Sequence, residues 1–419
     1  MHTVVRIIRV GCALSALTLR ILVQYPRGPR DLERLGERLA ACAERLGGAF
    51  LKAAQIFAAR SDLLPCQVRR PLARLQERVR ASIEPHPQIE RILAKPTQAI
   101  FSAIDPQPVG SASIAEVFRA TSHGRPVAIK LRRPHTNRLF EVDFRIARSV
   151  LSVARRWSVL RDLPLLPCFD RVARCVIEQT DLRKEAAFHR QFWRLFQRNE
   201  AILVPRIHEE LVHEEMLVTE YIHGLRPVND PTLNNELRQK AIVVGLQALY
   251  TMIFRAGLVH CDLHAGNVQI APDGRLVLLD FGAATVLAPR ERVAFARFFI
   301  SIACNDAASA AEVILEVAEH VPENLDRREL EQQLGALLLG ANSVTAGEFS
   351  VASFVASLFQ VQRNLHIHGS DSFATAIMAL AVYEGLIKEY CPQLDFQGEA
   401  VPFAMAALAE HDRAREAAC

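Results

Sequence analysis

The segment His260-Cys261-Asp262-Leu263-His264-Ala265-Gly266-Asn267, followed by Leu278-Leu279-Asp280-Phe281-Gly282, decides the fold of this chain. The mostly apolar residues 252–259 before it predict the end of a helix. Residues 268–270 and 275–279 predict two short strands joined by a turn at Asp273-Gly274. A hairpin of this kind would hold the two polar segments on one small surface.

Three side chains in these segments carry oxygen atoms that suit a metal: Asp262, Asn267 and Asp280. Two carboxylates and an amide fit Mg²⁺ bound to phosphates. The pattern H-x-D-x(4)-N followed by D-F-G is the catalytic and metal-binding set of the kinase fold. A D-F-G tripeptide alone occurs by chance, but its position eighteen residues after Asp262 makes the combination specific. The alternative interpretation is a pair of polar hairpin ends in an α/β domain.

The composition is that of an ordinary globular protein. The chain has 419 residues, which allows a large core and two or three domain-sized units. Half of the residues are hydrophobic and 23% are charged. The nine cysteines are scattered, without a C-x-x-C pair, and predict neither a disulfide framework nor a zinc site. A reducing compartment is therefore expected.

Positive charge is concentrated near the N-terminus. Residues 1–80 contain fifteen Lys or Arg and six Asp or Glu, whereas the whole chain carries a net charge of only +4. This excess predicts an anionic partner such as a membrane surface. Nucleic acid is not expected, because aromatic residues and a recognisable binding module are missing there.

Residues 1–29 form an apolar and basic N-terminal segment. Arg6, Arg9 and Arg20 interrupt its apolar stretch and leave only residues 10–19 uncharged, which is too short to span a bilayer. No signal-peptide cleavage site follows. The segment predicts either an interfacial amphipathic helix or a terminal helix packed on the body of the protein.

Residues 30–105 predict a helical extension. Apolar residues recur at helical spacing over 31–57, with a break expected at Gly47-Gly48, and shorter helices are expected over 72–79 and 89–93. Lys52 and Gln55 are three residues apart and share one helical face. By themselves, two polar residues on one face indicate only a solvated surface.

Residues 106–224 begin with a strand-like pattern. Residues 114–120 and 126–131 predict two antiparallel strands joined at His123-Gly124. Small residues just before them suit a loop that covers phosphates, because they let backbone N–H groups approach closely. These residues are Gly110, Ser111, Ala112 and Ser113. Lys130, at the end of the V-A-I-K segment, is then expected to reach the α- and β-phosphates of a nucleotide.

Two helices and two further strands complete this region. Helices are expected over 139–159 and 169–196, and the second carries Glu185, the best candidate to pair with Lys130 and orient its ammonium group. Strands are expected over 205–207 and 216–222. The last strand leads into a connection between two lobes, where backbone groups would hold an adenine ring. Glu220 is therefore assigned to the nucleotide site.

Residues 225–400 predict a helical second half. A long helix over 236–255 leads into the opening segment, and further helices are expected over 290–304, 307–320, 329–340, 349–364 and 372–390. The stretch 372–386 is apolar, but Glu384, Lys388 and the length of the stretch favour a buried helix over a membrane span. Within the tail of residues 401–419, the polar end from His411 is expected to fray.

These segments together resemble the UbiB family, also called ABC1 or ADCK, of atypical kinase-like proteins linked to ubiquinone biosynthesis. The resemblance covers roughly residues 30–400 and includes segments that ordinary kinases lack. Lys52-Ala-Ala-Gln55 resembles the K-x-G-Q motif of the family, and residues 108–117 resemble its alanine-rich loop. The resemblance implies an α+β, bilobal, protein-kinase-like fold, with a helical N-terminal extension packed on the catalytic cleft.

Three positions depart from the pattern of the family. Gln179-Thr180-Asp181 stands in place of E-x-D, so the first acid is absent, and Ala54 replaces the glycine of K-x-G-Q. Gly110 and Ser111 stand where the family mostly has Ala. In the family, the K-x-G-Q segment packs across the active-site cleft and, with the E-x-D acid, restricts peptide access. The resemblance thus assigns Lys52 and Gln55 to the cofactor site.

The resemblance implies binding of MgATP, or of ADP, between two lobes. Lys130, held by Glu185, would contact the phosphates, and Asn267 and Asp280 would ligate Mg²⁺. Asp262 would act as general base on a hydroxyl or water nucleophile. The implied activity is that of an ATPase or small-molecule kinase supporting quinone biosynthesis, in the cytoplasm and peripheral to the inner membrane. The implied partners are the membrane lipid surface, a quinone precursor, quinone-biosynthesis enzymes and a second copy of the chain.

Two alternatives stay open. One is a small-molecule phosphotransferase of the aminoglycoside or choline kinase type, whose loop is similar to residues 260–267. The segment around Lys52 and Gln55 and the Ser/Ala loop argue against it. The other is a scaffold that uses ATP only as a switch and assembles quinone-biosynthesis enzymes. The absent acid of the E-x-D motif keeps this second alternative open.

Overall fold

The computed structural model describes residues 2–23, 28–59, 64, 66–72, 74–75, 83–111, 114–154, 165–339 and 350–416. The chain divides into two compact units, and one of the boundaries falls within helix α9 (Leu182–Phe196). The first unit consists of Met1–Ala187 and Arg206–Tyr221, and the second unit of Phe188–Pro205 and Ile222–Cys419.

The first unit contains a five-stranded antiparallel sheet. Its main path runs β1 (Phe101–Ile104), β3 (Ala115–Ser122), β4 (Arg125–Arg132) and β6 (Met216–Glu220), and β2 (Gly110–Ser111) pairs with β3. The turn between β3 and β4 lies at His123 and Gly124, which both have positive φ, as expected. Along β4, Val127, Ile129 and Leu131 are buried in one apolar cluster. Since side chains alternate along a strand, Lys130 lies on the other face.

Seven helices described in the first unit precede α9. They are α1 (His2–Val23), α2 (Pro29–Leu46), α3 (Ala49–Ala59), α4 (Cys66–Leu72), α5 (Pro85–Leu93), α6 (Thr136–Ala154) and α8 (Leu165–Glu178). The expected break between α2 and α3 is confirmed, because Gly47 and Gly48 both have positive φ. Ala53 of α3 is buried against Phe144 of α6 and Val172 of α8, which joins the extension to the helices that follow β4.

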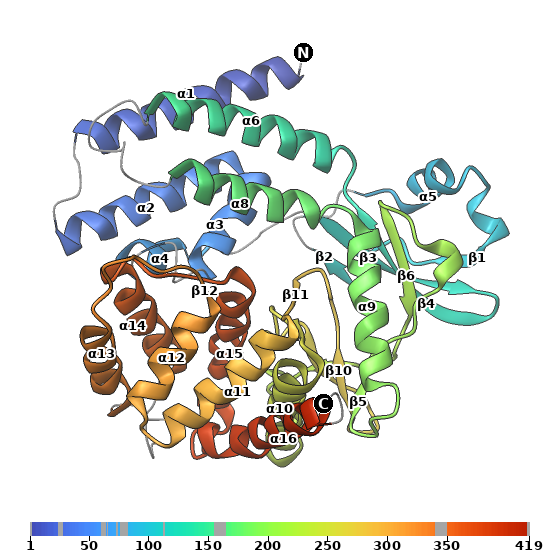
Figure 1. The fold of residues 1–419 in the computed structure, drawn as a ribbon. Coiled ribbons are helices and arrows are strands. Elements are labelled where there is room, and N and C mark those ends of the chain that lie inside the picture. Colours follow the sequence, from blue (N-terminus) through green and yellow to red (C-terminus); the bar gives the residue numbers. More distant parts are fainter. Residues whose placement is uncertain are drawn as a thin grey trace. The chain divides into compact units, whose positions relative to one another are not determined.

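Helix α1 packs along α6 (Figure 1). Arg6 forms an ion pair with Asp143 of α6, in which the Nη2–Oδ2 distance is 2.6 Å and the Asp143 side chain is 1% exposed. Val10 of α1 is buried, whereas Ile8 and Leu19 are 59% and 61% exposed. One side of this segment is therefore packed on the body, whereas the interfacial interpretation stays a prediction. None of the described helices combines the length and apolar character needed to cross a membrane.

Three small sheets are seen among the described residues of the second unit. One runs β5 (Ile202–Leu203), β10 (Leu276–Leu278), β9 (Val268–Ile270) and β7 (Arg226–Pro227); the others pair β11 (Ala284–Val286) with β8 (Leu258–His260) and β12 (Ala318–His320) with β13 (His368–Gly369). The hairpin expected after residue 267 is confirmed, since β9 and β10 pair antiparallel and Gly274 in their turn has a φ of 87°.

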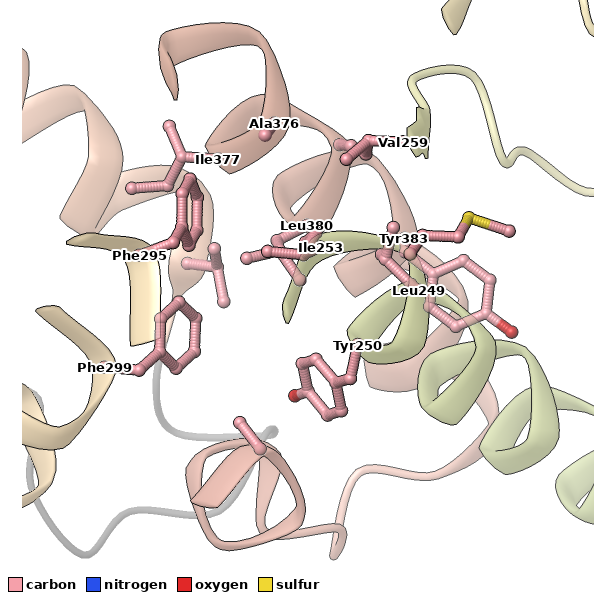
Figure 2. Close-up of a cluster of buried hydrophobic side chains, with 14 of the residues drawn as sticks. Leu249, Tyr250, Ile253, Val259, Phe295, Phe299, Ala376, Ile377, Leu380 and Tyr383 are labelled. Carbon is pink, nitrogen blue, oxygen red and sulfur yellow. The ribbon is translucent and has the colours of Figure 1, made fainter. Parts of the chain in front are cut away.

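Helices form most of the second unit and surround one large apolar core. They are α10 (Asn235–Tyr250), α11 (Pro289–Ala303), α12 (Ala307–Val317), α13 (Arg327–Leu339), α14 (Val351–Asn364), α15 (Asp371–Tyr390) and α16 (Phe396–Glu416). Tyr250, Phe295, Leu380 and Tyr383 meet in this core (Figure 2). The expected burial of α15 is confirmed: its Glu384 is 5% exposed and accepts hydrogen bonds from two backbone N–H groups at the start of α14.

Two expected elements of the region 169–207 differ from the structure. The single helix expected over 169–196 is wrong: α8 and α9 are separate helices, because the chain turns at Gln179 and Thr180. The strand expected over 205–207 is also wrong. The strand is β5, and Ile207 forms only an isolated bridge with Thr219.

Two expectations for the second unit, the helix end over 252–259 and the frayed tail from His411, can be compared with the structure. The helix end expected over 252–259 is a π-helical segment, η3 (Thr251–Ala256), which ends at Gly257 with a φ of 68° before β8. Helix α16 continues as far as Glu416, so the polar residues from His411 to Glu416 are helical, and their fraying stays a prediction. Most of the helix expected over 72–79 lies outside the described residues. The α+β class is confirmed.

Candidate functional site

Lys130 and Glu185 form an ion pair in the first unit. Lys130 is on β4, and Glu185 is in the first turn of α9. The Lys130 Nζ lies 2.7 Å from Oε1 and 2.8 Å from Oε2 of Glu185. The two side chains are 19% and 8% exposed, so a largely buried carboxylate orients the ammonium group.

Arg132, two residues after Lys130, fixes the start of α9. Its Nη1 donates to the carbonyl of Thr180 at 2.9 Å, and its Nη2 donates to Oε1 of Glu215 at 2.7 Å. Burial opposes the ionisation of Glu215, but hydrogen bonds from Arg91 and Arg132 outweigh it and hold the pKa of that carboxyl below its ordinary value. Strand β4 therefore carries both Lys130 and Arg132, and Arg132 positions α9, the helix that contains Glu185.

The altered E-x-D motif also serves the start of α9. Oδ1 of Asp181 accepts a hydrogen bond from the N–H of Arg183 at 3.0 Å, and both carboxylate oxygens accept from the Arg183 guanidinium. That guanidinium holds the pKa of Asp181 below its ordinary value. Glu178, the last residue of α8, forms an exposed ion pair with Lys184 at 3.1 Å. The acid that the motif keeps thus stabilises the first turn of α9.

The structure describes two of the four predicted loop residues. Gly110 pairs with Val117, and Ser111 pairs with Glu116, as the short strand β2. Ala112 and Ser113 lie outside the described residues. The Ser111 hydroxyl accepts a hydrogen bond from Nη2 of Arg133 at 2.9 Å. The predicted loop therefore begins as part of the sheet.

Lys52 and Gln55 lie on α3, and both are half-buried. Ala53 of the same helix is buried in one cluster with Ile114, the residue that follows the predicted loop. Ala54, which replaces the glycine of the family motif, is 7% exposed and packs in the cluster that includes Val68. The helix thus accommodates a β-carbon at this position.

Glu220 is the last residue of β6, and its side chain is exposed. Its N–H donates to the carbonyl of Arg206 at 2.8 Å, and it pairs with Val127 across the sheet. The backbone N–H of Glu220 is therefore committed to the fold.

Asp262 and Asn267 lie in the second unit, between β8 and β9. Nδ2 of Asn267 donates to the carbonyl of Asp262 at 2.9 Å, which leaves the amide oxygen as the ligand atom of Asn267. The N–H of Leu279 donates to the Asn267 carbonyl at 3.0 Å. The Asp262 side chain is 45% exposed, and its Oδ2 lies 3.8 Å from Nε2 of His264. The loop is thus tied to the residue just before Asp280.

Asp280 is exposed, whereas the next residue, Phe281, is fully buried. Asp280 has a φ of 54°, in the left-handed region, and its Oδ1 accepts a hydrogen bond from the N–H of Gly282 at 3.3 Å. The Phe281 ring lies 4.9 Å from that of Phe192 and 4.4 Å from that of His189. The buried ring anchors a backbone turn that keeps the carboxylate outside the core.

His260 is an anchor of the same loop. Its Nε2 donates to the carbonyl of Leu279 at 3.1 Å, and its Nδ1 accepts from the N–H of Asp262 at 3.2 Å. These partners fix the tautomer with hydrogen on Nε2. Burial lowers the pKa of His260, which favours the neutral ring that both hydrogen bonds require.

The donor set in the second unit fits Mg²⁺. The ion prefers carboxylate and amide oxygens and commonly keeps phosphate oxygens and water in its shell. Asp280 and Asn267 supply such oxygens, and the exposed carboxylate of Asp262 suits proton transfer. In the first unit, the ammonium group of Lys130 suits a phosphate. The first unit thus carries the residue suited to phosphate contact, and the second unit carries those suited to metal binding and proton transfer.

The sequence analysis did not identify Arg132, Arg133 and His189 as structurally important residues. The two arginines follow the V-A-I-K segment directly, but their partners are distant in sequence: Thr180 is 48 residues from Arg132, and Ser111 is 22 residues from Arg133. Two consecutive basic residues after a strand normally indicate solvated charge. Only the tertiary structure reveals that both are buried.

Comparison with known proteins identifies the family. The model of the ABC1 atypical kinase-like domain matches residues 74–314, more than half of the chain. The chain is similar to three proteins named "Probable protein kinase UbiB": it is 27% identical to that of Marinobacter nauticus over 397 residues, 28% to that of Tolumonas auensis over 392 and 29% to that of Aeromonas salmonicida over 402. The matches cover 91%, 91% and 92% of this chain and 72%, 71% and 72% of the three relatives.

Among solved structures, the complex of Rv3197 with erythromycin from Mycobacterium tuberculosis is similar, with a TM-score of 0.49 and 18% identity over 83% of this chain and 93% of that one. The family match includes Lys130, Glu185 and the whole segment 260–282, and it confirms the predicted kinase-like fold class. This chain therefore belongs to the ABC1 family of atypical kinase-like proteins.

Proposed function

We propose that this protein binds MgATP and uses it as an atypical kinase or ATPase that supports isoprenoid quinone biosynthesis at a membrane. The Lys130–Glu185 ion pair carries this proposal. A lysine on a strand normally extends into water, whereas this one is held by both oxygens of a buried carboxylate. An ammonium fixed in this way is pre-organised to contact phosphate oxygens.

The residues of the first unit bind the nucleotide. Lys130 contacts the phosphates, and Glu185 keeps the ammonium in place. The loop from Gly110 to Ser113 contributes backbone N–H groups to the phosphates. Lys52, Gln55 and Glu220 are assigned supporting contacts with the nucleotide.

The residues of the second unit perform the chemistry. Asn267 and Asp280 hold Mg²⁺, which supplies positive charge to the phosphate oxygens when bound. Asp262 orients the acceptor hydroxyl or water and takes its proton on a carboxylate oxygen. His260 stays neutral and keeps the loop in shape. Positioning and electrostatics supply most of the rate enhancement.

Peripheral membrane association is the second part of the proposal. Exposed apolar side chains of α1, namely Ile7, Ile8 and Leu19, lie next in sequence to exposed Arg9 and Arg20. This combination suits an anionic lipid surface. Co-sedimentation with anionic vesicles tests it: Ile8→Glu with Leu19→Glu should weaken binding. Equal binding of the double variant would contradict a role for α1.

Nucleotide binding tests the first part. Wild type should bind MgATP and hydrolyse or transfer its γ-phosphate, and Lys130→Ala should lose binding. Quinone profiling of a deletion strain, complemented with wild type or with Lys130→Ala, tests the pathway. An unchanged quinone profile would overturn the assignment to quinone biosynthesis but not nucleotide binding. A wild-type protein without affinity for MgATP would overturn the proposed function itself.

A further inference from the structure

The imidazole ring of His264 approaches the carboxylate of Asp262, the proposed base. The distance from Nε2 of His264 to Oδ2 of Asp262 is 3.8 Å, and the two side chains are 54% and 45% exposed. This separation is too long for a direct hydrogen bond. One oxygen atom between the two groups can hydrogen-bond to both, because two hydrogen bonds of ordinary length that meet at an oxygen span about 4 Å.

A backbone hydrogen bond decides which ring nitrogen of His264 carries the hydrogen. Nδ1 accepts from the N–H of Gly266 at 3.0 Å. A neutral imidazole has one donor and one acceptor nitrogen, so the hydrogen is on Nε2. The ring nitrogen nearest to Asp262 is therefore a donor, whereas the Asp262 carboxylate is an acceptor. A donor and an acceptor at this separation match the lone pair and the hydrogen of an O–H group.

The loop backbone holds the two side chains in this relation. The carbonyl of Asp262 accepts hydrogen bonds from the N–H of His264 at 3.0 Å and from Nδ2 of Asn267 at 2.9 Å. The carbonyl of His264 accepts from the N–H groups of Asn267 and Val268, at 2.9 and 3.1 Å. The base and the imidazole thus belong to one hydrogen-bonded turn.

Gly266 leaves the space that the imidazole ring occupies. A β-carbon at position 266 would lie 2.8 Å from Cε1 and 3.0 Å from Nδ1 of His264. Gly266 is not among the glycines with positive φ, so its backbone conformation suits other residues as well. The place of the His264 ring is therefore the feature that a side chain at position 266 would disturb.

We propose that His264 is a catalytic residue that orients the attacking oxygen, which is that of water in the ATPase reaction. This inference rests on the proposed function. Nε2–H donates to the oxygen, and the oxygen donates its proton to Asp262. A second lone pair of the oxygen forms the bond to the γ-phosphorus, the bond from that phosphorus to the β,γ-bridging oxygen breaks, and ADP leaves. Two fixed hydrogen bonds restrict the nucleophile to one orientation, which lowers the barrier.

Two substitutions of His264 separate this role from a structural one. An Asn side chain can still accept from the Gly266 N–H, as in an Asx turn, but places no donor at the position of Nε2. A Gln side chain is longer and brings an amide N–H toward that position. His264→Asn should lower the kcat for phosphate release from MgATP by about 10- to 100-fold and leave the Kd for MgATP unchanged. His264→Gln should recover part of that loss.

His213→Asn is the matched control. Nδ1 of His213 also accepts from the N–H two residues later, that of Glu215, at 3.2 Å. His213 lies in the first unit and is assigned no contact with the nucleotide or with the nucleophile. The kcat of His213→Asn should therefore match that of wild type. Gly266→Ala should displace the His264 ring and lower kcat as His264→Asn does.

The tautomer of His264 provides a readout that does not depend on turnover. In protein whose histidines are labelled with heavy nitrogen, NMR should show His264 with its hydrogen on Nε2. The signal that disappears in His264→Gln identifies this residue. A hydrogen on Nδ1 instead would overturn the inference, because the nitrogen nearest to Asp262 would then be an acceptor.

The kinetic outcomes separate the inference from the proposed function. A wild-type kcat in His264→Asn, or equal losses in the Asn and Gln variants, would overturn the inference while the proposed function stands. A wild-type protein that binds MgATP but releases no phosphate in water would also overturn the inference. A wild-type protein that binds no MgATP would overturn the proposed function as well.

Discussion

The Nζ atom of Lys130 lies within hydrogen-bond distance of both carboxylate oxygens of Glu185, at 2.7 and 2.8 Å, although 55 residues separate the two in sequence. The pair joins a strand to the first turn of a helix, and both side chains are mostly shielded from water. Its geometry therefore depends on how the start of α9 is fixed. Arg132 does this from β4, and Asp181 does it from the position just before the helix.

Replacing Glu185 with Gln should impair catalysis. The amide keeps the shape of the side chain but loses the charge that orients the ammonium group of Lys130. The kcat/KM for ATP should fall by about 10- to 100-fold, which corresponds to about 1.4–2.7 kcal/mol of transition-state stabilisation. Steady-state measurement of phosphate release or transfer, with thermal unfolding to verify folding, provides the test.

Glu178→Gln is the control for this variant. Glu178 also pairs with a lysine, but both side chains of that pair are 52% exposed, and exposed pairs contribute little. Its kcat/KM should match wild type. If Glu185→Gln also matched wild type, the ion pair would have no role in catalysis.

Asp280→Asn should change the dependence on Mg²⁺. Asp280 is exposed while its neighbour Phe281 is buried, so the substitution should leave the core intact. Removal of an outer-shell partner of a metal typically costs about 10- to 100-fold in metal affinity, and loss of a direct ligand should cost at least that much. Titration of nucleotide binding with Mg²⁺ measures the shift.

Asp273→Asn serves as the control for the metal assignment. Asp273 lies in the turn of the β9–β10 hairpin, where hydrogen bonds with the Arg275 side chain lower the pKa of its carboxyl. The Asp273→Asn variant should bind nucleotide with the same Mg²⁺ dependence as wild type. An equal shift in both variants would point to a general effect of negative charge rather than to a ligand.

Local spacing explains why much of the candidate site could be predicted. Asp262, Asn267 and Asp280 flank one short hairpin, whose apolar strands and Asp-Gly turn are visible in the sequence. Lys130 likewise was predicted from one short segment, V-A-I-K, at residues 127–130. These features depend on residues within about 20 positions of one another, the range at which periodicity and turn chemistry operate.

Long-range contacts explain the errors. No Gly or Pro marks the break between α8 and α9, so the helical pattern runs through Gln179 and Thr180. The break is stabilised by Arg132, which donates to the Thr180 carbonyl from another element. Partners this far apart leave no periodic signal in either segment.

Glu215 should make the protein more sensitive to acid. Arg91 and Arg132 hold the pKa of its carboxyl below the ordinary value. A carboxyl with a lowered folded-state pKa stabilises the protein above its unfolded-state pKa, and this stability is lost as the pH falls through the folded-state value. Wild type should therefore lose stability from about pH 4.3 downward through this group.

Glu215→Gln should remove that contribution. The variant should have a lower Tm than wild type near neutral pH, and the difference should shrink as the medium is made more acidic than the ordinary pKa of a glutamate. Thermal unfolding of both proteins over a pH series measures it. A constant difference across the whole series would mean that Glu215 stabilises the fold through packing rather than through its charge.

Gly245→Ala should destabilise the second unit through a steric clash between the added β-carbon and the Tyr383 side chain. Gly245 lies on α10, where an added β-carbon would be 2.0 Å from the Tyr383 hydroxyl oxygen and 2.9 Å from Cζ. Tyr383 is fully buried among Leu249, Ile253 and Leu380, so its ring has little room to move (Figure 2). Overpacking of this kind typically costs about 1–3 kcal/mol. Denaturant unfolding should show the loss.

A double-mutant cycle can assign that loss to the hydroxyl group. Tyr383→Phe alone removes the hydrogen bond to the carbonyl of Ile242 and should cost about 1 kcal/mol. Combined with Gly245→Ala, it should cost less than the sum of the two single changes, because the closest atom in the collision is gone. Gly385→Ala on α15 is the matched control, since no atom lies within 4 Å of its added β-carbon. Its stability should equal or exceed that of wild type, given the helix propensity of alanine. Strict additivity of Gly245→Ala and Tyr383→Phe would show that the glycine is required for a reason other than the tyrosine hydroxyl.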